Sequence, residues 1–373
     1  LQGFGQSVWL DYLRRGLFTS GEFQRLIDED GLRGVTSNPS IFEKAIAGGT
    51  EYVAAIQELE HQRMEPMALY EALATSDIRA AADWLHPVYD GTARADGYAS
   101  LEVSPYLAHD TSATIEEARR LWKAVDRDNL MIKVPATLEG LPAIRQLTSE
   151  GINVNITLLF GIDRYDAVAQ AYLEGLSELV HRGGDPGPVS SVASFFVSRI
   201  DTMVDGMITE RLATVTDPDA RAALTSLLGE VGIANARLAY QHYLAVCRST
   251  AWQALAAKGA RPQRLLWAST STKNPRYRDV RYVEELIGRD TINTMTPATI
   301  EAFRDHGRLR GALEADVESA RHVLEALDRT GISLEEVTGR LLEDGIMLFS
   351  KAFDTLLAAL GRNRRSELER APG

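Results

Sequence analysis

The chain has 373 residues, 45% of them hydrophobic, which is enough to bury a large core in one barrel or in two ordinary domains. Its formal net charge of −12, with no block of Lys or Arg, argues against nucleic acid as a partner. The apolar runs are far shorter than the roughly 20 residues that span a bilayer, so no membrane partner is expected.

Side chains that could hold a metal or a disulfide are scarce. Cys247 is the one cysteine, and the seven histidines follow no metal-ligand spacing. Neither a GxGxxG nor a P-loop pattern occurs, so we expect no metal and no nucleotide cofactor. The first residues show no basic or apolar leader region, and a cytoplasmic location is the default expectation.

Short β-rich runs alternate with helical patterns along most of the chain, as in βα units around a parallel sheet. Eight predicted strands with helices between them favour a closed (β/α)8 barrel, a TIM barrel with additional helices. The predicted strands are 7–12, 34–38, 98–103, 130–135, 152–158, 190–196, 264–269 and 291–295.

Three helix starts are predicted from the capping box, in which a hydroxyl and a carboxylate satisfy each other's backbone donors. The pairs are Thr19 with Glu22, Thr114 with Glu117, and Ser333 with Glu336.

The domain organisation is expected to be a single barrel spanning residues 1–373. Two helical insertions, about 201–259 and 297–360, are longer than one crossover helix needs, and we expect them to brace or cover the barrel. The segment 361–373 is polar and rich in arginine, which predicts a frayed end or the start of a linker.

One lysine lies in the middle of an apolar predicted strand. Six of the 40 basic residues are lysines, at 44, 123, 133, 258, 273 and 351, and Lys133 falls within the run Leu-Met-Ile-Lys-Val-Pro. Both faces of a parallel strand are normally covered, and burial disfavours the charged ammonium. Because the uncharged amine is the form that attacks a carbonyl, the position predicts an amine nucleophile. The alternative is a structural lysine that reaches out at the strand end or pairs with a buried carboxylate.

Two acidic residues, Asp11 and Glu102, lie in or near the ends of predicted strands. Parallel barrel strands direct their carboxyl ends to one face, where active sites of this fold collect. Schiff-base chemistry needs one group to move protons as the imine forms and another to deprotonate a hydroxyl as the carbon bond breaks. Each acid alone could equally be an ordinary strand-end or capping residue.

Polar residues stand at other strand ends, where a purely structural barrel would carry apolar ones. Asn38, Asn155, Thr157 and Ser194 could hydrogen-bond sugar hydroxyls. For Asn38 the alternative is a simple turn, since a proline follows it. For Asn155 the alternative is a buried amide satisfied by the protein itself.

A phosphate group would require cations and donors near the late strands. Arg199, Ser269 and Lys273 lie there. A solvated surface position is the alternative for Lys273.

These segments together resemble the transaldolases, and the resemblance runs over nearly the whole chain. It implies a (β/α)8 barrel with class I aldolase chemistry and no metal or other cofactor. The segments that carry it are SVWLD from residue 7, GVTSNPS from 34, LEV from 101, IKVPAT from 132, NITLLF from 155 and ASTSTKN from 268.

The resemblance also implies roles for individual residues. Lys133 would be the Schiff-base lysine, Glu102 would work with a water in imine formation, and Asp11 would be the base for the sugar hydroxyl. The positions implied to line the substrate site are Thr36, Asn38, Asn155, Thr157, Ser194 and Phe196, and those implied to bind phosphate are Arg199 and Ser269. Many transaldolases have a further arginine after that serine, whereas this chain has Lys273.

The implied reaction transfers a dihydroxyacetone unit between sugar phosphates, which are the expected partners. Two alternatives remain: cleavage without transfer, as in fructose-6-phosphate aldolase, and a non-catalytic barrel that only binds sugar phosphates. The aldolase is shorter and has a tyrosine in place of the glutamate, so Glu102 and the chain length favour transfer. The first residues also resemble the transaldolase half of proteins fused to glucose-6-phosphate isomerase, so a covalent isomerase partner is a further expectation.

Overall fold

Eight parallel strands close into one barrel in the computed structural model, which describes residues 1–47, 49–60 and 64–368. Each strand pairs with the next along the chain, and the first closes the barrel against the eighth. The predicted (β/α)8 barrel is confirmed. The strands are β1 (Gln6–Asp11), β2 (Leu32–Thr36), β3 (Tyr98–Glu102), β4 (Leu130–Pro135), β5 (Val154–Leu159), β6 (Ser191–Phe196), β7 (Arg264–Ala268) and β8 (Thr291–Met295).

Strand positions follow the sequence prediction closely. β4 and β8 have the expected bounds, and the other strands differ by one or two residues at one or both ends. The largest shift is in β2, which ends at Thr36 and not at Asn38. Asn38 caps the next helix and Pro39 begins it, which removes both residues from the sheet.

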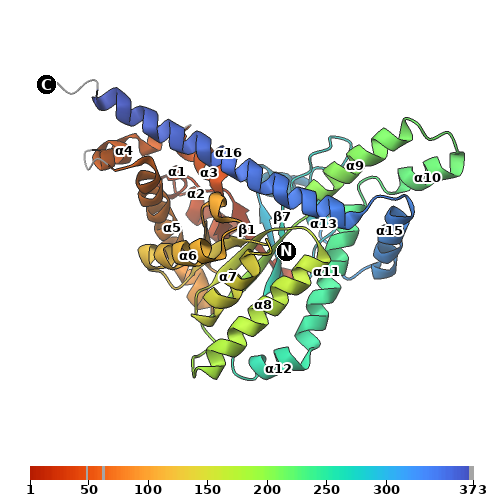
Figure 1. Ribbon diagram of the computed structural model, residues 1–373, viewed down its shortest axis with the longest axis horizontal. Helices are drawn as coiled ribbons and strands as arrows, with labels where there is room; N and C mark the ends of the chain where they lie inside the picture. The colour runs from red at the N-terminus through yellow and green to blue at the C-terminus, as the bar shows by residue number, and fades with distance from the viewer. Residues whose placement is uncertain (48, 61–63, 369–373) are drawn as a thin grey trace.

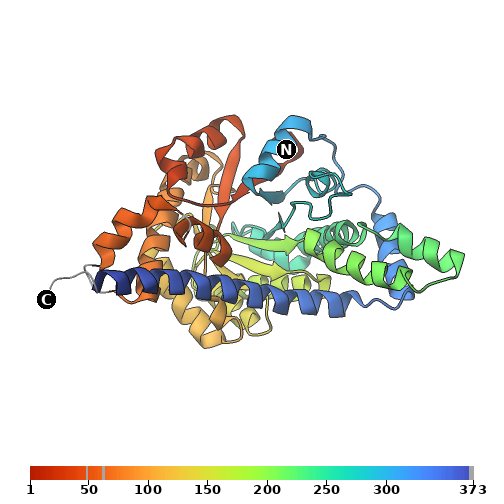
Figure 2. The same cartoon turned by 90° about the horizontal axis from the view of Figure 1, so that it is seen from above.

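Helices surround the barrel and connect its strands (Figures 1 and 2). Up to β6 they are α1 (Gly16–Thr19), α2 (Glu22–Glu29), α3 (Pro39–Phe42), α4 (Val53–Glu60), α5 (Pro66–Gly91), α6 (Thr111–Val125), α7 (Gly140–Ser149) and α8 (Ile162–His181). After β6 they are α9 (Ser198–Leu212), α10 (Pro218–Ser226), α11 (Val231–Arg248), α12 (Thr250–Ala256), α13 (Arg281–Glu284), α14 (Pro297–His306), α15 (Val317–Arg329) and α16 (Leu334–Leu368). Short 3-10 segments are η1 (Gln2–Phe4), η3 (Thr50–Tyr52) and η4 (Pro105–Leu107), and η2 (Glu43–Ala47) is a π-helical turn.

Across these described residues, no helix has both the length and the apolar character needed to cross a membrane.

The two stretches expected as helical insertions hold α9 to α12 and α14 to α16. The last of these helices does not end at the predicted boundary, residue 360. α16 continues to Leu368, so most of the segment expected as a polar tail is helical, and residues 369–373 lie outside the described part of the chain.

α16 lies across one end of the barrel (Figures 1 and 2) and packs against α3, α5, η2 and α9. Its buried residues, such as Phe349, Phe353 and Leu360, recur at helical spacing and form one apolar face. The ring of Phe353 makes edge contacts with Tyr70 of α5 and Tyr106 of η4. Because this stripe reaches Leu360 and no proline follows within the helix, the helix extends past the expected boundary.

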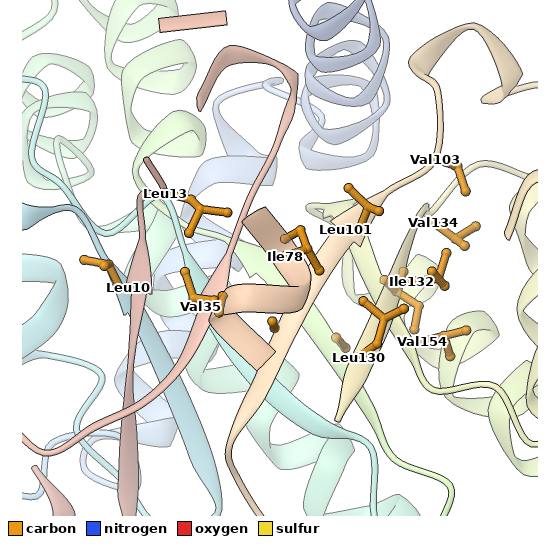
Figure 3. Packing of buried hydrophobic residues seen from close by; sticks show 14 of the residues in the cluster. Leu10, Leu13, Val35, Ile78, Leu101, Val103, Leu130, Ile132, Val134 and Val154 are labelled. Atoms are coloured by element: carbon orange, nitrogen blue, oxygen red, sulfur yellow. The ribbon is translucent and has the colours of Figure 1, made fainter. Parts of the chain in front are cut away.

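Alternation along the strands separates two layers of side chains. Leu130, Ile132 and Val134 of β4 lie in the same apolar cluster as Ile78 of α5, between the barrel and its helices (Figure 3). Met131, between them, belongs to a different cluster. Side chains at alternate positions of a strand point to opposite faces, so the residues at 131 and 133 face the barrel interior.

One of the three predicted capping boxes provides a helix cap. The hydroxyl of Ser333 accepts a hydrogen bond from the Glu336 N–H at 3.2 Å, where α16 begins. The other two predictions are wrong: Thr19 ends α1, and Thr114 lies inside α6, which is capped by Asp110. The motif is local, whereas the first residue of a helix is also decided by packing against the barrel.

Asp201 joins three helices through one buried carboxylate. It lies in α9 and is 1% exposed. Its oxygens accept hydrogen bonds from the Gly232 N–H of α11 at 2.7 Å and from the Tyr282 hydroxyl of α13 at 2.8 Å. Burial raises the pKa of Asp201 to about 6, although both hydrogen bonds act in the opposite direction.

We expect the Asp201→Asn variant to flatten the pH dependence of stability. A carboxyl whose pKa is about 6 in the folded state and 3.8 ordinarily binds its proton more tightly when folded, so the free energy of unfolding falls as pH rises through this range. The loss from this group is about 3 kcal/mol between about pH 4 and about pH 8. Chemical denaturation at several pH values measures it, with Asp219→Asn on α10 as an exposed control. Parallel curves for the wild type and Asp201→Asn would contradict the expectation.

Candidate active site

Lys133 and Glu102 point into the barrel because their neighbours along each strand point out. Leu101 and Val103 flank Glu102 in the outer apolar layer, as Ile132 and Val134 flank Lys133 (Figure 3). The strand register places Glu102 beside Lys133. The same register places Lys133 beside Asn155 on the other side. Three predicted residues on consecutive strands therefore lie next to one another.

Lys133 and Glu102 form a buried pair. The Lys133 Nζ lies 3.2 Å from Glu102 Oε2 and donates to the carbonyl oxygen of Ser37 at 2.9 Å. The two residues are 4% and 6% exposed. Burial raises the pKa of the Glu102 carboxyl, although the neighbouring lysine opposes this change. A carboxyl with a raised pKa accepts a proton more readily, so the proton of the ammonium has a nearby acceptor.

A purely structural lysine would also pair with a buried carboxylate, so the ion pair alone does not distinguish a structural lysine from a nucleophile. The cavity next to Lys133 distinguishes them. The residue borders a cavity of about 670 Å³, which is lined by residues at and beyond the carboxyl ends of the strands. An amine in this position can be reached by a small molecule, as a nucleophile must be.

The cavity collects most of the residues predicted for the site. Glu102 and Asn155 each contact a residue that lines the cavity: Glu102 contacts Lys133, and Asn155 contacts Ser194. α16 contributes one wall through Leu348, Phe349, Lys351, Ala352 and Thr355. The predicted residues that line the cavity are Asp11, Thr36, Asn38, Lys133, Thr157, Ser194, Phe196, Arg199, Ser269 and Lys273.

Asp11 ends β1 at the edge of the cavity. Its Oδ1 accepts a hydrogen bond from the Thr36 hydroxyl at 2.8 Å, and that hydroxyl lies 3.0 Å from the hydroxyl of Thr294. Among the described residues, none donates to the other carboxylate oxygen, Oδ2. The carboxylate is thus held in place through one oxygen and retains one for a ligand.

Two polar residues of β5 have different surroundings. Asn155 donates to the Ser100 hydroxyl at 3.0 Å and accepts from the Ser194 hydroxyl at 2.7 Å, which is the satisfied buried amide considered above. The hydroxyl of Thr157 is buried and has no hydrogen-bond partner within the described residues. The strand is irregular next to it, because Leu158 has a φ of 55°. Thr157 therefore offers the cavity an unsatisfied hydroxyl.

Asn38 also caps a helix. Its Oδ1 accepts a hydrogen bond from the Ile41 N–H at 3.0 Å at the start of α3. The alternative interpretation was a simple turn, whereas the structure begins a helix at this point. The cap does not use the amide nitrogen, and the residue lines the cavity as well.

Arg199 and Ser269 lie together beyond β6 and β7. Arg199 is in the first turn of α9, which has no side-chain cap, and its guanidinium lies 5.2 Å from the ring centre of Phe196. Burial lowers the pKa of Arg199, although Asp11 and Glu102 oppose this. Ser269 has a φ of 55°, and its hydroxyl lies 3.0 Å from that of Ser198. A helix N-terminus with a guanidinium and hydroxyls suits a phosphate group.

Lys273 lines the same cavity from the segment after β7, although the residue as a whole is exposed. Partial burial lowers the pKa of Lys273, and the nearby cations Arg199 and Lys44 lower it further. In the part of the chain that the structure describes, no cluster of three or more His, Cys, Asp or Glu side chains is arranged to hold a metal ion. The cationic side chains that line this cavity are Lys44, Lys133, Arg199, Lys273 and Lys351.

Lys44, Thr294 and Lys351 are among the cavity residues that the sequence did not lead us to predict. Thr294 carried a usable signal, because it is a polar residue near the end of a predicted strand. Lys44 and Lys351 carried only a weak one, the rarity of lysine in this chain. Their approach to the cavity depends on where η2 and α16 pack.

An eight-stranded parallel barrel in which a lysine, two carboxylates and several cations meet beyond the strand ends has the architecture of a (β/α)8-barrel enzyme. A family model described as transaldolase/fructose-6-phosphate aldolase matches residues 8–360. The chain belongs to this family.

Individual relatives agree with the family match. A protein named transaldolase from Trichodesmium erythraeum is 48% identical over 362 residues, covering 96% of this chain and 95% of the relative. Transaldolases from Thiobacillus denitrificans and Thermobifida fusca are 48% and 46% identical, and each alignment covers 96% of this chain. These two alignments cover 97% and 95% of the relatives, so these proteins have no room for an isomerase domain. They lend no support to the expected fusion.

Proposed function

We propose that this chain catalyses the transaldolase reaction of the pentose phosphate pathway. It transfers a dihydroxyacetone unit from sedoheptulose 7-phosphate or fructose 6-phosphate to glyceraldehyde 3-phosphate or erythrose 4-phosphate. The observation that carries the proposal is the buried amine of Lys133, 3.2 Å from Glu102 and bordering the same cavity as Asp11. Similarity over nearly the whole length to proteins named transaldolase supports the same reaction.

The first stage is imine formation. The Lys133 amine gives up its proton, with Glu102 as the nearest acceptor, and attacks the C2 carbonyl of the ketose. The resulting carbinolamine loses its hydroxyl as water, for which Glu102 returns the proton. The raised pKa of Glu102 favours this role, because the carboxyl must be able to hold a proton between the two steps.

The second stage breaks and remakes a carbon–carbon bond. Asp11 takes the proton of the C4 hydroxyl, the C3–C4 electron pair moves towards the iminium nitrogen, and an aldose phosphate leaves. The dihydroxyacetone unit stays on Lys133 as an enamine until a second aldose phosphate accepts it by the reverse steps. Thr36 fixes Asp11 by its 2.8 Å hydrogen bond, so the base is oriented before the substrate binds.

Recognition of the substrate is assigned to the rest of the cavity. Thr157, Ser194 and Asn38 can hydrogen-bond the sugar hydroxyls, with Asn155 positioning Ser194 at 2.7 Å. Arg199 and Ser269 bind the phosphate, and Lys273 adds a positive charge at the same end.

Borohydride reduction tests the assignment of the nucleophile. We expect treatment with fructose 6-phosphate and sodium borohydride to attach a reduced dihydroxyacetone unit to Lys133, because hydride traps the imine as a stable amine. Mass mapping of the peptides locates the adduct, and borohydride without the sugar phosphate is the control. An adduct on any other lysine would overturn the site.

Transfer and simple cleavage are separated by the acceptor. We expect consumption of fructose 6-phosphate to require erythrose 4-phosphate. Equal turnover without an acceptor would indicate an aldolase, and the absence of both turnover and adduct would indicate a binding protein.

We also propose a cytoplasmic location, which fits a chain with a single cysteine.

A further inference from the structure

Residues 269–280 connect β7 to α13 and contain no regular helix or strand. This connection carries Ser269 and Lys273, two of the three residues assigned to the phosphate end of the cavity. The third, Arg199, is in the first turn of α9. The phosphate subsite therefore spans two elements, and its geometry depends on how the connection is fixed relative to α9.

Lys273 lies near Arg199 against electrostatic repulsion. Partial burial lowers the pKa of Lys273 and Arg199 lowers it further, although Asp11 opposes this, so the two cations are close enough to repel each other. Among the described residues, none forms an ion pair or a hydrogen bond with the Lys273 side chain. The position of this ammonium must therefore come from the backbone that carries it.

Tyr277 anchors the connection to α9. Its hydroxyl donates a hydrogen bond of 2.6 Å to Oδ2 of Asp205. Its N–H donates to the carbonyl of Asn274 at 3.0 Å, which closes the turn that follows Lys273. Asp205 is 8% exposed, and its Oδ1 accepts a hydrogen bond from the Gly229 N–H at 2.9 Å. The bond from Gly229 orients the carboxylate independently of the tyrosine.

The ring of Tyr277 is closely packed. Gly229 has a φ of 73°, and a Cβ at this position would lie 2.6 Å from Cζ of the ring, so the ring packs directly against the glycine. The guanidinium of Arg281 lies 5.0 Å from the ring centre. Burial raises the pKa of the Tyr277 hydroxyl and Asp205 raises it further, so the hydroxyl remains a donor at neutral pH.

We propose that Tyr277 is a positioning residue that sets the affinity for phosphate by fixing Lys273 beside Arg199 through its hydrogen bond to Asp205. The inference rests on the proposed function and concerns the same phosphate subsite. Lys273 lines the sugar-phosphate cavity and also a second cavity of about 420 Å³, which Asp205 and Tyr277 line as well. Release of this anchor would let the repulsion move Lys273 away from Arg199 and weaken the binding of an anion.

The Tyr277→Phe variant removes the hydroxyl and keeps the ring. Calorimetric titration with inorganic phosphate is expected to give a Kd about fivefold higher than that of the wild type. Tyr282→Phe is the matched control, because the Tyr282 hydroxyl donates a similar hydrogen bond to Asp201 of the same helix, at 2.8 Å. The control should lose stability in thermal unfolding and keep the wild-type Kd. Circular dichroism establishes that each variant is folded.

A double-mutant cycle tests whether Tyr277 acts through Lys273. Lys273→Met alone should raise the phosphate Kd by about fivefold or more, and adding Tyr277→Phe to it should change the Kd by less than about twofold. Additive effects of the two substitutions would overturn the inference, as would an unchanged Kd in Tyr277→Phe or a wild type that binds no phosphate.

Steady-state kinetics supply a second readout. The KM for erythrose 4-phosphate should rise about fivefold in Tyr277→Phe, with kcat and the KM for unphosphorylated erythrose unchanged, because the chemistry at Lys133 is not altered. An equal rise in both KM values would indicate a general structural effect and contradict the positioning role. Because the titration requires no turnover, an inactive wild-type enzyme would refute the proposed function, and the phosphate Kd would still decide the role of Tyr277.

Discussion

Replacement of Lys133 by methionine is expected to lower kcat by at least about 10⁴-fold, because the covalent route through an imine is lost entirely. Methionine has a similar length and an apolar character suited to the interior of β4, where the native side chain is 5% exposed. The Glu102 carboxyl would lose its cationic partner. Since burial already raises its pKa, Glu102 can take up a proton and remain buried as the neutral acid.

The expected cost in stability is therefore modest, about 1–3 kcal/mol, and the variant should fold. A coupled assay of sugar-phosphate turnover measures kcat, and thermal unfolding measures the stability. Lys123→Met on α6 is the control for loss of an exposed lysine and should retain wild-type kcat. Retention of more than about 1% of the wild-type rate by Lys133→Met would be incompatible with an essential amine.

The second largest effect is expected for Glu102→Gln, with a fall in kcat of about 10²- to 10³-fold and a much smaller change in KM. Glutamine preserves the size of the side chain and a hydrogen-bond acceptor next to the Lys133 ammonium, but it cannot take up or return a proton. Rapid-quench trapping with borohydride should show slower imine formation in this variant. Glu116→Gln, on the exposed side of α6, is the matched control.

The pH dependence distinguishes proton transfer from simple positioning. Burial raises the pKa of Glu102, so the protonated carboxyl, which assists the loss of water, persists to higher pH than in an exposed glutamate and declines as pH rises through that pKa. The rate of imine formation in the wild type should fall on that alkaline side because of this carboxyl. Glu102→Gln should lack this part of the profile. Identical profiles for the two proteins would show that Glu102 positions the lysine without exchanging a proton.

The barrel was predictable because its signals are local. Each strand is a short β-rich run, and β4 and β8 have the predicted bounds. The inward direction of Lys133 also follows from local sequence, since its neighbours Ile132 and Val134 are apolar and alternate residues share a face. A charged residue between two apolar strand residues therefore indicates a functional position.

Details of the site depended on the tertiary structure. The sequence could not distinguish a turn at Asn38 from a substrate contact. In the structure Asn38 caps a helix and also lines the cavity. The same holds for Asn155, whose amide is satisfied by Ser100 and Ser194 from neighbouring strands. Whether a polar group is satisfied depends on partners that are distant in the chain, and local patterns carry no information about them.

The order of the strands, the inward lysine and the acids near the strand ends follow from short stretches of sequence, because strand alternation and the shared direction of parallel strands are local properties. The position of α16 across the mouth of the barrel depends on long-range packing. Packing of Phe353 against Tyr70 and Tyr106 holds the helix there and brings Lys351 to the cavity. Contacts between segments hundreds of residues apart are selected by the shape of the assembled surfaces, which no single stretch of sequence contains.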